Sequence, residues 1–222
     1  MEYTHPTEGR GWGLMSGDKP RLSNRIAQAV VVLGVAAGLG SAALAEVRSS
    51  TQTRAYNVGG TTARSLVSYM RSRPFAGSHG DAVANIRPTY ALSVATRQSG
   101  SVCRASKVTL NIRFVMTLPR AQSASAMSAS TRWAWNAFAA FSRRHEETHR
   151  SIYVQCGNSF VAKAERMTAS NCGALQASIR QLLEREKKAC ESRQRAFDRS
   201  DYRRVANLSL FRMARGSSRA SR

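Results

Sequence analysis

A short run of the sequence has the residue types of a hydrolytic metal site. His145 and His149 are four residues apart, with Glu146 directly after the first, in the run His145-Glu146-Glu147-Thr148-His149. On a helix, side chains at i and i+4 lie one turn apart on one face, so both imidazoles aim the same way. Such a pair supplies two nitrogen ligands for zinc, and the Glu stands beside them, where it can take a proton from a zinc-bound water. The pattern predicts a zinc-dependent peptidase with His145 and His149 as ligands and Glu146 as general base.

Two other interpretations of this run are open. The histidines can be core side chains with hydrogen-bond partners, or they can lie on an exposed turn, since Arg143, Arg144 and Arg150 flank them. An unpaired imidazole is costly to bury, and both histidines fall on the apolar face of the expected helix. The metal site is therefore the preferred interpretation.

The third protein ligand of the expected metal is left open by the sequence. Catalytic zinc takes three protein ligands. The longer pattern that supplies a third His is absent, because Ile152 and Gln155 stand at its Gly and His positions. The remaining candidates are His79 and the downstream carboxylates Glu165, Glu184, Glu186, Asp198 and Asp201, of which Glu184 and Glu186 are expected to face solvent. Asp198 is preferred, either as a ligand or as a residue that orients one.

Other side chains have candidate supporting roles around the motif. Tyr153 or Tyr202 is a candidate hydrogen-bond donor to the oxyanion of the reaction. Glu165, sixteen residues after His149, is expected to point away from the metal or to lie too far from it. Trp133 and Trp135 are expected to be core residues that shield the site from water.

A long helix is predicted to carry the motif, from Thr131 to about Met167. Its apolar residues and both histidines recur at steps of three and four, which places them on one face. These residues are Trp135, Phe138, Phe141, His145, His149, Ile152, Cys156 and Phe160. A second helix is predicted to start near Ser170 or Asn171, a good N-cap. Its inward residues are Leu175, Ile179, Leu182 and Leu183.

The segment before the long helix is predicted to form a short helix and a small sheet. The expected elements are a strand over residues 52–58 and a helix over 61–73 that starts at a threonine N-cap. Alternating apolar residues predict strands over 90–94 and 108–116, joined as an antiparallel hairpin. The expected fold class is α+β: a small antiparallel sheet with a short helix, followed by two long helices that form a hairpin and include a zincin-like HExxH helix.

The first residues of the chain are typical of a secretory signal peptide. Basic residues precede an apolar run from Ile26 to Gly40, and the run ends in Ala43-Leu44-Ala45. It is shorter than the roughly 20 apolar residues of a membrane span, so no transmembrane segment is expected after cleavage. The predicted parts are a signal peptide over 1–45 with an over-extended start over 1–14, a domain over 46–205, and a basic C-terminal tail over 206–222. A periplasmic or secreted location follows.

The composition is strongly basic. Lys and Arg number 34 against 13 Asp and Glu, for a formal net charge of +21. Arginine makes up most of the excess, which a GC-rich genome also explains. The charge predicts a generic attraction to anionic envelope polymers. No helix-turn-helix or aromatic-interleaved basic motif predicts a specific nucleic-acid partner.

The cysteines predict covalent staples. All four follow the expected signal peptide: Cys103, Cys156, Cys172 and Cys190. An even number in an exported chain predicts two disulfides, for which the sequence alone allows three pairings. None of the spacings is the C-x-x-C of a zinc site.

The chain resembles a family of bacterial proteins predicted to be secreted zinc-dependent proteases and classed as a domain of unknown function. The resemblance runs from about Tyr56 to Tyr202. Its marks are Tyr56-Asn57-Val58-Gly59-Gly60, the segment 87–94, Cys103, Thr117-Leu118-Pro119, Trp135-Asn136-Ala137-Phe138, the run 145–149, Cys172-Gly173-Ala174-Leu175 and Phe197-Asp198.

The resemblance implies export, a zinc ion at His145 and His149, and Glu146 as the base. It also implies a disulfide pairing, namely Cys103 with Cys172 and Cys156 with Cys190. Similar proteins often end this region with an acid followed by His-Gly, whereas this chain has Arg203-Arg204 at that place. The third ligand therefore stays open.

The sequence as a whole predicts a secreted or periplasmic zinc-dependent peptidase, with a peptide or an envelope protein as substrate. The alternative is a non-catalytic basic protein that binds the cell envelope, or a periplasmic metal-binding protein. Zinc content and the effect of Glu146→Gln on cleavage distinguish these functions.

Overall fold

The computed structural model describes residues 46–73, 75–77 and 80–216. The expected signal peptide over 1–45, with its start over 1–14, lies outside the described residues, and so do His79 and the last six residues of the basic tail.

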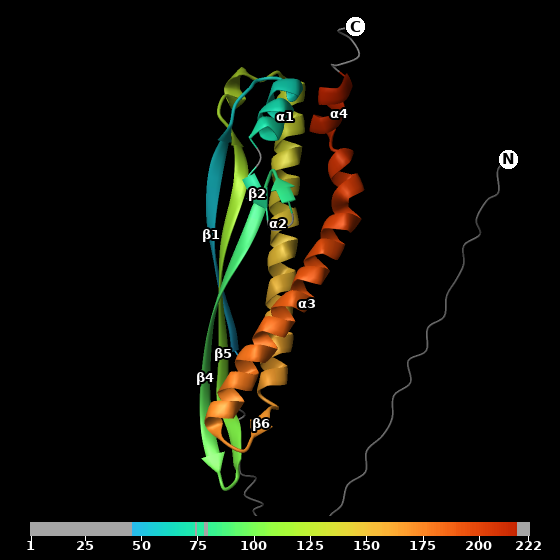
Figure 1. The fold of residues 1–222 in the computed structure, drawn as a ribbon. Helices are drawn as coiled ribbons and strands as arrows, with labels where there is room; N and C mark the ends of the chain where they lie inside the picture. Colours follow the sequence, from blue (N-terminus) through green and yellow to red (C-terminus); the bar gives the residue numbers. More distant parts are fainter. Residues whose placement is uncertain (1–45, 74, 78–79, 217–222) are drawn as a thin grey trace, which may run out of the picture. The chain divides into compact units, whose positions relative to one another are not determined.

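A four-stranded sheet forms one layer of the fold (Figure 1). Its central strand is β5 (Val102–Ala121), which pairs with β4 (Asn85–Ser99) on one side and with β1 (Glu46–Val58) on the other. The short strand β6 (Thr168–Ala169) pairs with the start of β5. Two further strands, β2 (Phe75–Gly77) and β3 (Gly80–Ala82), form a separate antiparallel pair.

The α+β class is confirmed, but the sheet is mixed rather than antiparallel. The expected hairpin forms as β4 and β5, and Gly100 takes a φ of +58° in its turn. The first strand, β1, pairs in parallel with β5, the second strand of that hairpin. Side-chain alternation identifies a strand but does not say which edge of a sheet it joins, and for this reason the sequence did not predict the parallel pair.

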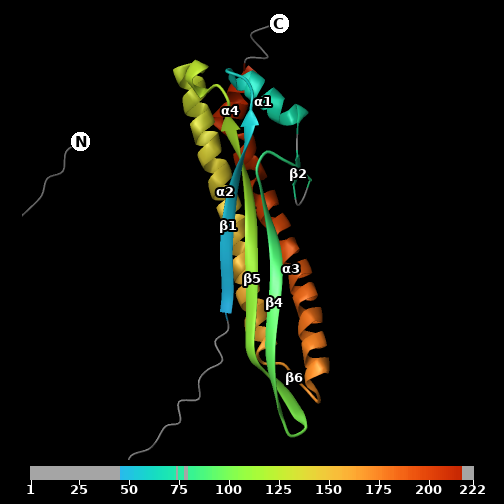
Figure 2. The same cartoon turned by 90° about the vertical axis from the view of Figure 1, so that its left-hand side faces the viewer.

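Two long helices cover one face of this sheet and form a hairpin (Figure 1). Helix α2 spans Ala129–Ala164, and its N-cap Ser128 accepts a hydrogen bond from the backbone N–H of Thr131. Helix α3 spans Cys172–Ala206, and its N-cap Asn171 accepts one from the N–H of Ala174. Figure 2 shows α2 beside β1 and α3 beside β4. Both helices were predicted, and the observed N-cap of α3 is one of the two expected residues.

The main core lies between the sheet and the two long helices. Alternate residues of β5 point into it and are almost completely buried, namely Val108, Leu110, Ile112, Phe114 and Met116. Helix α2 approaches this row closely at Gly157, where a Cβ atom would lie 3.1 Å from Cδ1 of Ile112. The glycine lets α2 pack closely on the sheet, which fixes the height of the helix above it.

A second cluster of buried residues lies around helices α1 (Ala63–Ser72) and α4 (Ser209–Gly216). Helix α1 begins at the N-cap Thr62, as expected. Residues 209–216 of the expected basic tail form α4, in which Leu210 is fully buried. Phe211 packs edge-on against Phe138 of α2, with ring centroids 5.6 Å apart. The cluster thus joins the C-terminal segment to the start of α2.

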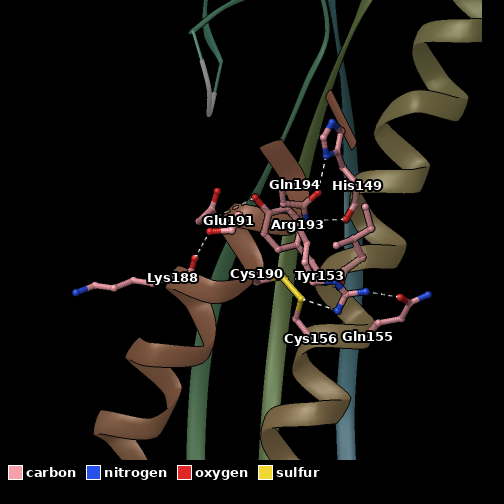
Figure 3. The surroundings of a disulfide bond; sticks show 11 residues. His149, Tyr153, Gln155, Cys156, Lys188, Cys190, Glu191, Arg193 and Gln194 are labelled. Atoms are coloured by element: carbon pink, nitrogen blue, oxygen red, sulfur yellow. Dashed lines mark hydrogen bonds between the residues drawn. A yellow bond between two sulfur atoms is a disulfide. The ribbon is translucent and has the colours of Figure 1, made fainter. Parts of the chain in front are cut away.

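Two disulfides staple the helical hairpin. Cys103–Cys172 links the start of β5 to the start of α3, and Cys156–Cys190 links α2 to α3 (Figure 3). This is the pairing that the resemblance implies. By chain entropy, closing loops of 69 and 34 residues stabilises a fold by about 4 kcal/mol each. None of the described helices is long and apolar enough to cross a membrane.

Candidate metal centre

Three potential ligand atoms meet between α2 and α3. The Nε2 atoms of His145 and His149 lie 3.1 Å apart, one helical turn from each other on α2. From α3, Oδ1 of Asp198 lies 2.8 Å from Nε2 of His149 and 3.4 Å from Nε2 of His145. Of the candidates Asp198 and Asp201, which the structure describes, Asp198 thus lies against both imidazoles and Asp201 against His145.

The spacing of these atoms fits a small divalent cation. Zinc bound tetrahedrally at about 2.0–2.1 Å from its ligands keeps the ligand atoms roughly 3.3–3.4 Å apart. The separations of 3.1 and 3.4 Å are close to that value, whereas the 2.8 Å between Nε2 of His149 and Oδ1 of Asp198 is shorter, a hydrogen-bond distance that would lengthen around a metal ion. Two imidazoles and one carboxylate form a ligand set that zinc uses in catalytic sites, with a further position left for water.

The outer nitrogen of each imidazole has its own hydrogen-bond acceptor. Nδ1 of His145 lies 2.9 Å from Oδ2 of Asp201, and Nδ1 of His149 lies 2.6 Å from Oε1 of Gln194. The amide nitrogen of Gln194 donates to the backbone carbonyl of His149, which fixes the orientation of the amide. Since both acceptors are oxygens, they favour a proton on Nδ1 of each ring, so that Nε2 would present its lone pair to a metal ion bound at the common point.

These partners come from one face of α3. Gln194, Asp198 and Asp201 are spaced at i, i+4 and i+7, so they lie on successive turns facing α2. Asp201 is only 3% exposed, and its second oxygen pairs with Arg204 at 2.9 Å. The sequence interpretation did not include Gln194. Its spacing of four residues from Asp198 and seven from Asp201 could have placed it on the same helix face as these two residues.

Aromatic rings enclose the imidazoles. The ring of Phe197 is stacked on His145 at 4.8 Å and lies edge-on to His149 at 4.9 Å. The expected shielding by tryptophans is wrong for Trp133, which is 68% exposed, while Trp135 packs in the second cluster with α1 and α4. Trp133 lies on the solvent side of α2 although its neighbour Ala134 is buried, so proximity in sequence did not predict its surroundings.

Glu146 is a buried carboxylate beside the two histidines. It is 4% exposed, on the α2 face toward the start of β4, where the backbone of Ile86 forms a hydrogen bond to it. Burial raises the pKa of Glu146 above its ordinary value, and the two nearby imidazoles act in the opposite direction. A carboxylate with a raised pKa is a stronger base, as proton abstraction from water requires.

The electrostatics of the centre favour a cation. Burial alone would raise the pKa of Asp198, but hydrogen bonds with His145 and His149 outweigh it and hold that pKa well below its usual range. For His145, burial acts in the other direction and lowers the pKa. Its hydrogen bonds with Asp198 and Asp201 outweigh burial, so the pKa of His145 lies above its ordinary value. Three carboxylates therefore surround two imidazoles in a chain of net charge +21, an arrangement that a bound cation neutralises.

The other candidates have different surroundings. The hydroxyl of Tyr153 donates to Oε1 of Glu191 at 3.2 Å (Figure 3). Tyr202 is 73% exposed. Glu165 caps the far end of α2, about 24 Å along the helix from His149 at the usual rise per residue.

A groove begins one helical turn from the centre. It has a volume of about 560 Å³, and residues of β4 including Arg87 and Tyr90 line it together with Tyr153, Lys187 and Glu191. Tyr153 follows His149 by four residues, and Glu191 precedes Gln194 by three. Since β4 is an edge strand of the sheet, the groove offers space for an extended ligand next to the histidines.

The family of the chain was identified by comparison with protein-family models. Residues 53–203 match the model described as "Bacterial protein of unknown function (DUF922)". Because the match covers more than half of the chain, the chain belongs to this bacterial family. Searches of curated proteins and of solved structures gave no match.

Proposed function

From the geometry of the metal centre, we propose that this member of the family is an exported zinc-dependent peptidase. His145, His149 and Asp198 are the proposed zinc ligands, and Glu146 is the proposed general base. The substrate class is a peptide or an envelope protein. The two disulfides support export to the periplasm or beyond, since such bonds persist in oxidising compartments.

One observation carries the proposal. The inner nitrogens of two histidines and a carboxylate oxygen converge within 3.4 Å of one another, while each outer nitrogen already has a separate acceptor. Two ordinary core histidines do not need their inner nitrogens brought together around one carboxylate oxygen. The outer partners Asp201 and Gln194 match the way in which metal-binding histidines are oriented.

The residues of the chain divide the hydrolysis between them. Zinc, when bound, supplies a Lewis acid that lowers the pKa of water and polarises the scissile carbonyl. Glu146 takes the proton of the attacking water and passes it to the leaving amine, so it acts first as base and then as acid. Asp201 and Gln194 hold the imidazoles in place, and Phe197 excludes water from their faces.

The proposal is tested by comparing two neighbouring glutamates. Glu146→Gln keeps the size of the buried side chain but removes the base, so kcat/KM on a peptide library is expected to fall by at least about 100-fold. Zinc content, measured by elemental analysis, is expected to remain stoichiometric. Glu147→Gln is the matched control, because Glu147 is exposed on the next position of the same helix; its activity is expected to change less than about twofold.

Three results have different meanings. Loss of cleavage in Glu146→Gln but not in Glu147→Gln supports the proposed peptidase activity. Stoichiometric zinc with no cleavage, or with equal cleavage in both variants, identifies a metal-binding protein without this activity. Absence of zinc after purification in its presence rejects the metal centre and leaves envelope binding as the function.

A further inference from the structure

The disulfide Cys156–Cys190 lies next to the candidate metal centre. Cys156 follows His149 by seven residues on α2, and Cys190 precedes Gln194 by four on α3. Figure 3 shows the crosslink between the two helices together with the contact between His149 and Gln194. Because the two imidazoles come from α2 and Asp198 comes from α3, the geometry of the centre depends on the separation of these helices at this level.

The crosslink is the last buried non-polar group of α3 before the centre. The buried residues of this helix are first apolar, ending at Leu183, and then continue with Cys190, Gln194 and Asp201. Gln194 and Asp201 contact α2 through hydrogen bonds to the imidazoles, and such bonds form only over a narrow range of distances. The crosslink at Cys190 thus helps to set the helix separation at which these polar contacts are made.

One sulfur of this disulfide is accessible and lies beside a cation. Cys156 is partly exposed, whereas Cys190 is only 2% exposed. The Nη1 atom of Arg193 lies 3.5 Å from Sγ of Cys156. A positive charge attracts a thiolate, which is the nucleophile of thiol–disulfide exchange. Exposure and charge therefore both direct such an attack to Sγ of Cys156.

The other disulfide has different surroundings. Cys103 is completely buried, and the atom that lies 3.4 Å from Sγ of Cys172 is the carbonyl oxygen Oε1 of Gln98. An oxygen with partial negative charge does not attract a thiolate. Cys172 also lies about 39 Å from Asp198 along α3, whereas Cys190 lies about 12 Å from it, at the usual rise per residue. Cys103–Cys172 thus serves as a natural control for Cys156–Cys190.

We propose that Cys156–Cys190 is a site of thiol–disulfide exchange with a dithiol protein, and that its reduction weakens metal binding. A thiolate of the dithiol attacks Sγ of Cys156, the S–S bond breaks, and Cys190 leaves as a thiolate that takes up a proton. The second thiol of the dithiol attacks the mixed disulfide and releases Cys156 as a thiol. The dithiol is thereby oxidised to a disulfide while the crosslink gains two electrons. The effect on the metal rests on the proposed function, whereas the exchange itself does not.

The exchange site is tested by the order of reduction in the folded protein. Dithiothreitol is the dithiol, samples are alkylated at intervals, and peptide mapping by mass spectrometry follows each disulfide. Cys156–Cys190 is expected to be reduced first. Arg193→Gln is expected to slow its reduction by about three- to fourfold, the effect of one nearby charge in a watery environment. Arg195→Gln is the matched control, because Arg195 is also exposed on α3, and its rate is expected to equal that of the wild type.

The effect on the metal is tested by zinc affinity, measured by competition with a chromogenic chelator. Cys156→Ser with Cys190→Ser removes the crosslink and leaves no thiol to bind zinc itself, and Kd is expected to rise by about 10- to 100-fold, as when the partners of metal-bound histidines are displaced. Cys103→Ser with Cys172→Ser is expected to change Kd by less than about threefold, because that crosslink is distant from the centre. Circular dichroism checks the fold of each variant. The same titration of wild-type protein, with the two thiols capped by methylthio groups after selective reduction, makes the comparison without substitutions.

Each result decides one part of the inference. Reduction of Cys103–Cys172 first, or of both disulfides at the same rate, overturns the exchange site. Zinc binding that is equal in the oxidised protein, the capped protein and the Cys156→Ser, Cys190→Ser variant overturns the coupling to the metal and leaves the proposed function standing. Absence of zinc from the oxidised wild type rejects the metal centre and the coupling together, while the order of reduction still decides the exchange site.

Discussion

At the scale of single residues, the metal centre depends on which ring nitrogen of each histidine carries a proton. Asp201 and Gln194 each lie at hydrogen-bond distance from an Nδ1 atom, so both Nε2 atoms would be free to bind a metal ion with their lone pairs. The buried position of Asp201 strengthens this effect, because a hydrogen bond to a carboxylate is stronger away from water. In the proposed centre, Asp201 would therefore act on the metal through His145 rather than as a ligand.

Asp201→Asn is expected to weaken zinc binding by about 10- to 100-fold, the usual cost of losing a partner of a metal-bound histidine. The substitution keeps the shape of the side chain but removes the charge that holds the proton on Nδ1 of His145. Competition with a chromogenic chelator measures the change in Kd. Arg204→Gln is the control, since it removes the exposed partner of Asp201 and leaves the bond to His145. An unchanged Kd in Asp201→Asn would show that Asp201 has no influence on the centre.

At the scale of elements, the candidate metal centre lies where the buried stripes of two helices change from apolar to polar. Along α3 the buried residues are Leu175, Ile179, Leu183, Cys190, Gln194 and Asp201. Along α2 the same stripe includes Ser142, Glu146 and His149 before it continues with Tyr153, Gly157 and Phe160. The polar parts of the two stripes face each other. Each helix thus uses one continuous face for both packing and chemistry.

This continuity explains which features the sequence could predict. The steps of three and four in α2 and the N-cap residue Asn171 of α3 correctly predicted the helical hairpin, and alternation predicted β4 and β5. Gln194 was missed because the apolar pattern of α3 ends before it, and a polar residue among charged ones is typical of a solvated face. The edge at which β1 joins the sheet was missed because pairing partners distant in sequence leave no local signal.

The close contact between α2 and the sheet gives a prediction for Gly157. A side chain at this position meets Ile112 at 3.1 Å and Leu110 at 3.3 Å from its Cβ alone, so Gly157→Leu is expected to lower the free energy of unfolding by about 1–3 kcal/mol or more through overpacking. Gly173→Leu is the control, because Gly173 is exposed in the first turn of α3. Urea unfolding of both variants measures the difference. Equal stability of the two would show that the helix can move away from the sheet at little cost.

At the scale of the whole molecule, charge is distributed unevenly. The chain carries 34 basic and 13 acidic residues, yet three of the acids surround the two histidines, whereas α1 and α4 have none. The disulfide Cys156–Cys190 holds α2 and α3 together two turns after His149 and one turn before Gln194 (Figure 3). The disulfide therefore fixes the two helices on either side of the candidate metal centre.

Because the helical hairpin is already stapled, zinc is expected to add to the stability of a folded protein rather than to cause its folding. A ligand present at 100 times its Kd stabilises a protein by about 2.7 kcal/mol, which corresponds to a rise in Tm of roughly 5–11 °C for a domain of this size. Differential scanning calorimetry with zinc and with a chelator measures this rise. The variant His145→Ala with His149→Ala lacks both nitrogen ligands, so its Tm is expected to be the same in both conditions. A similar rise in that variant would place the stabilising zinc elsewhere on the chain, and complete unfolding of the wild type by the chelator would show that packing and disulfides do not preform the centre.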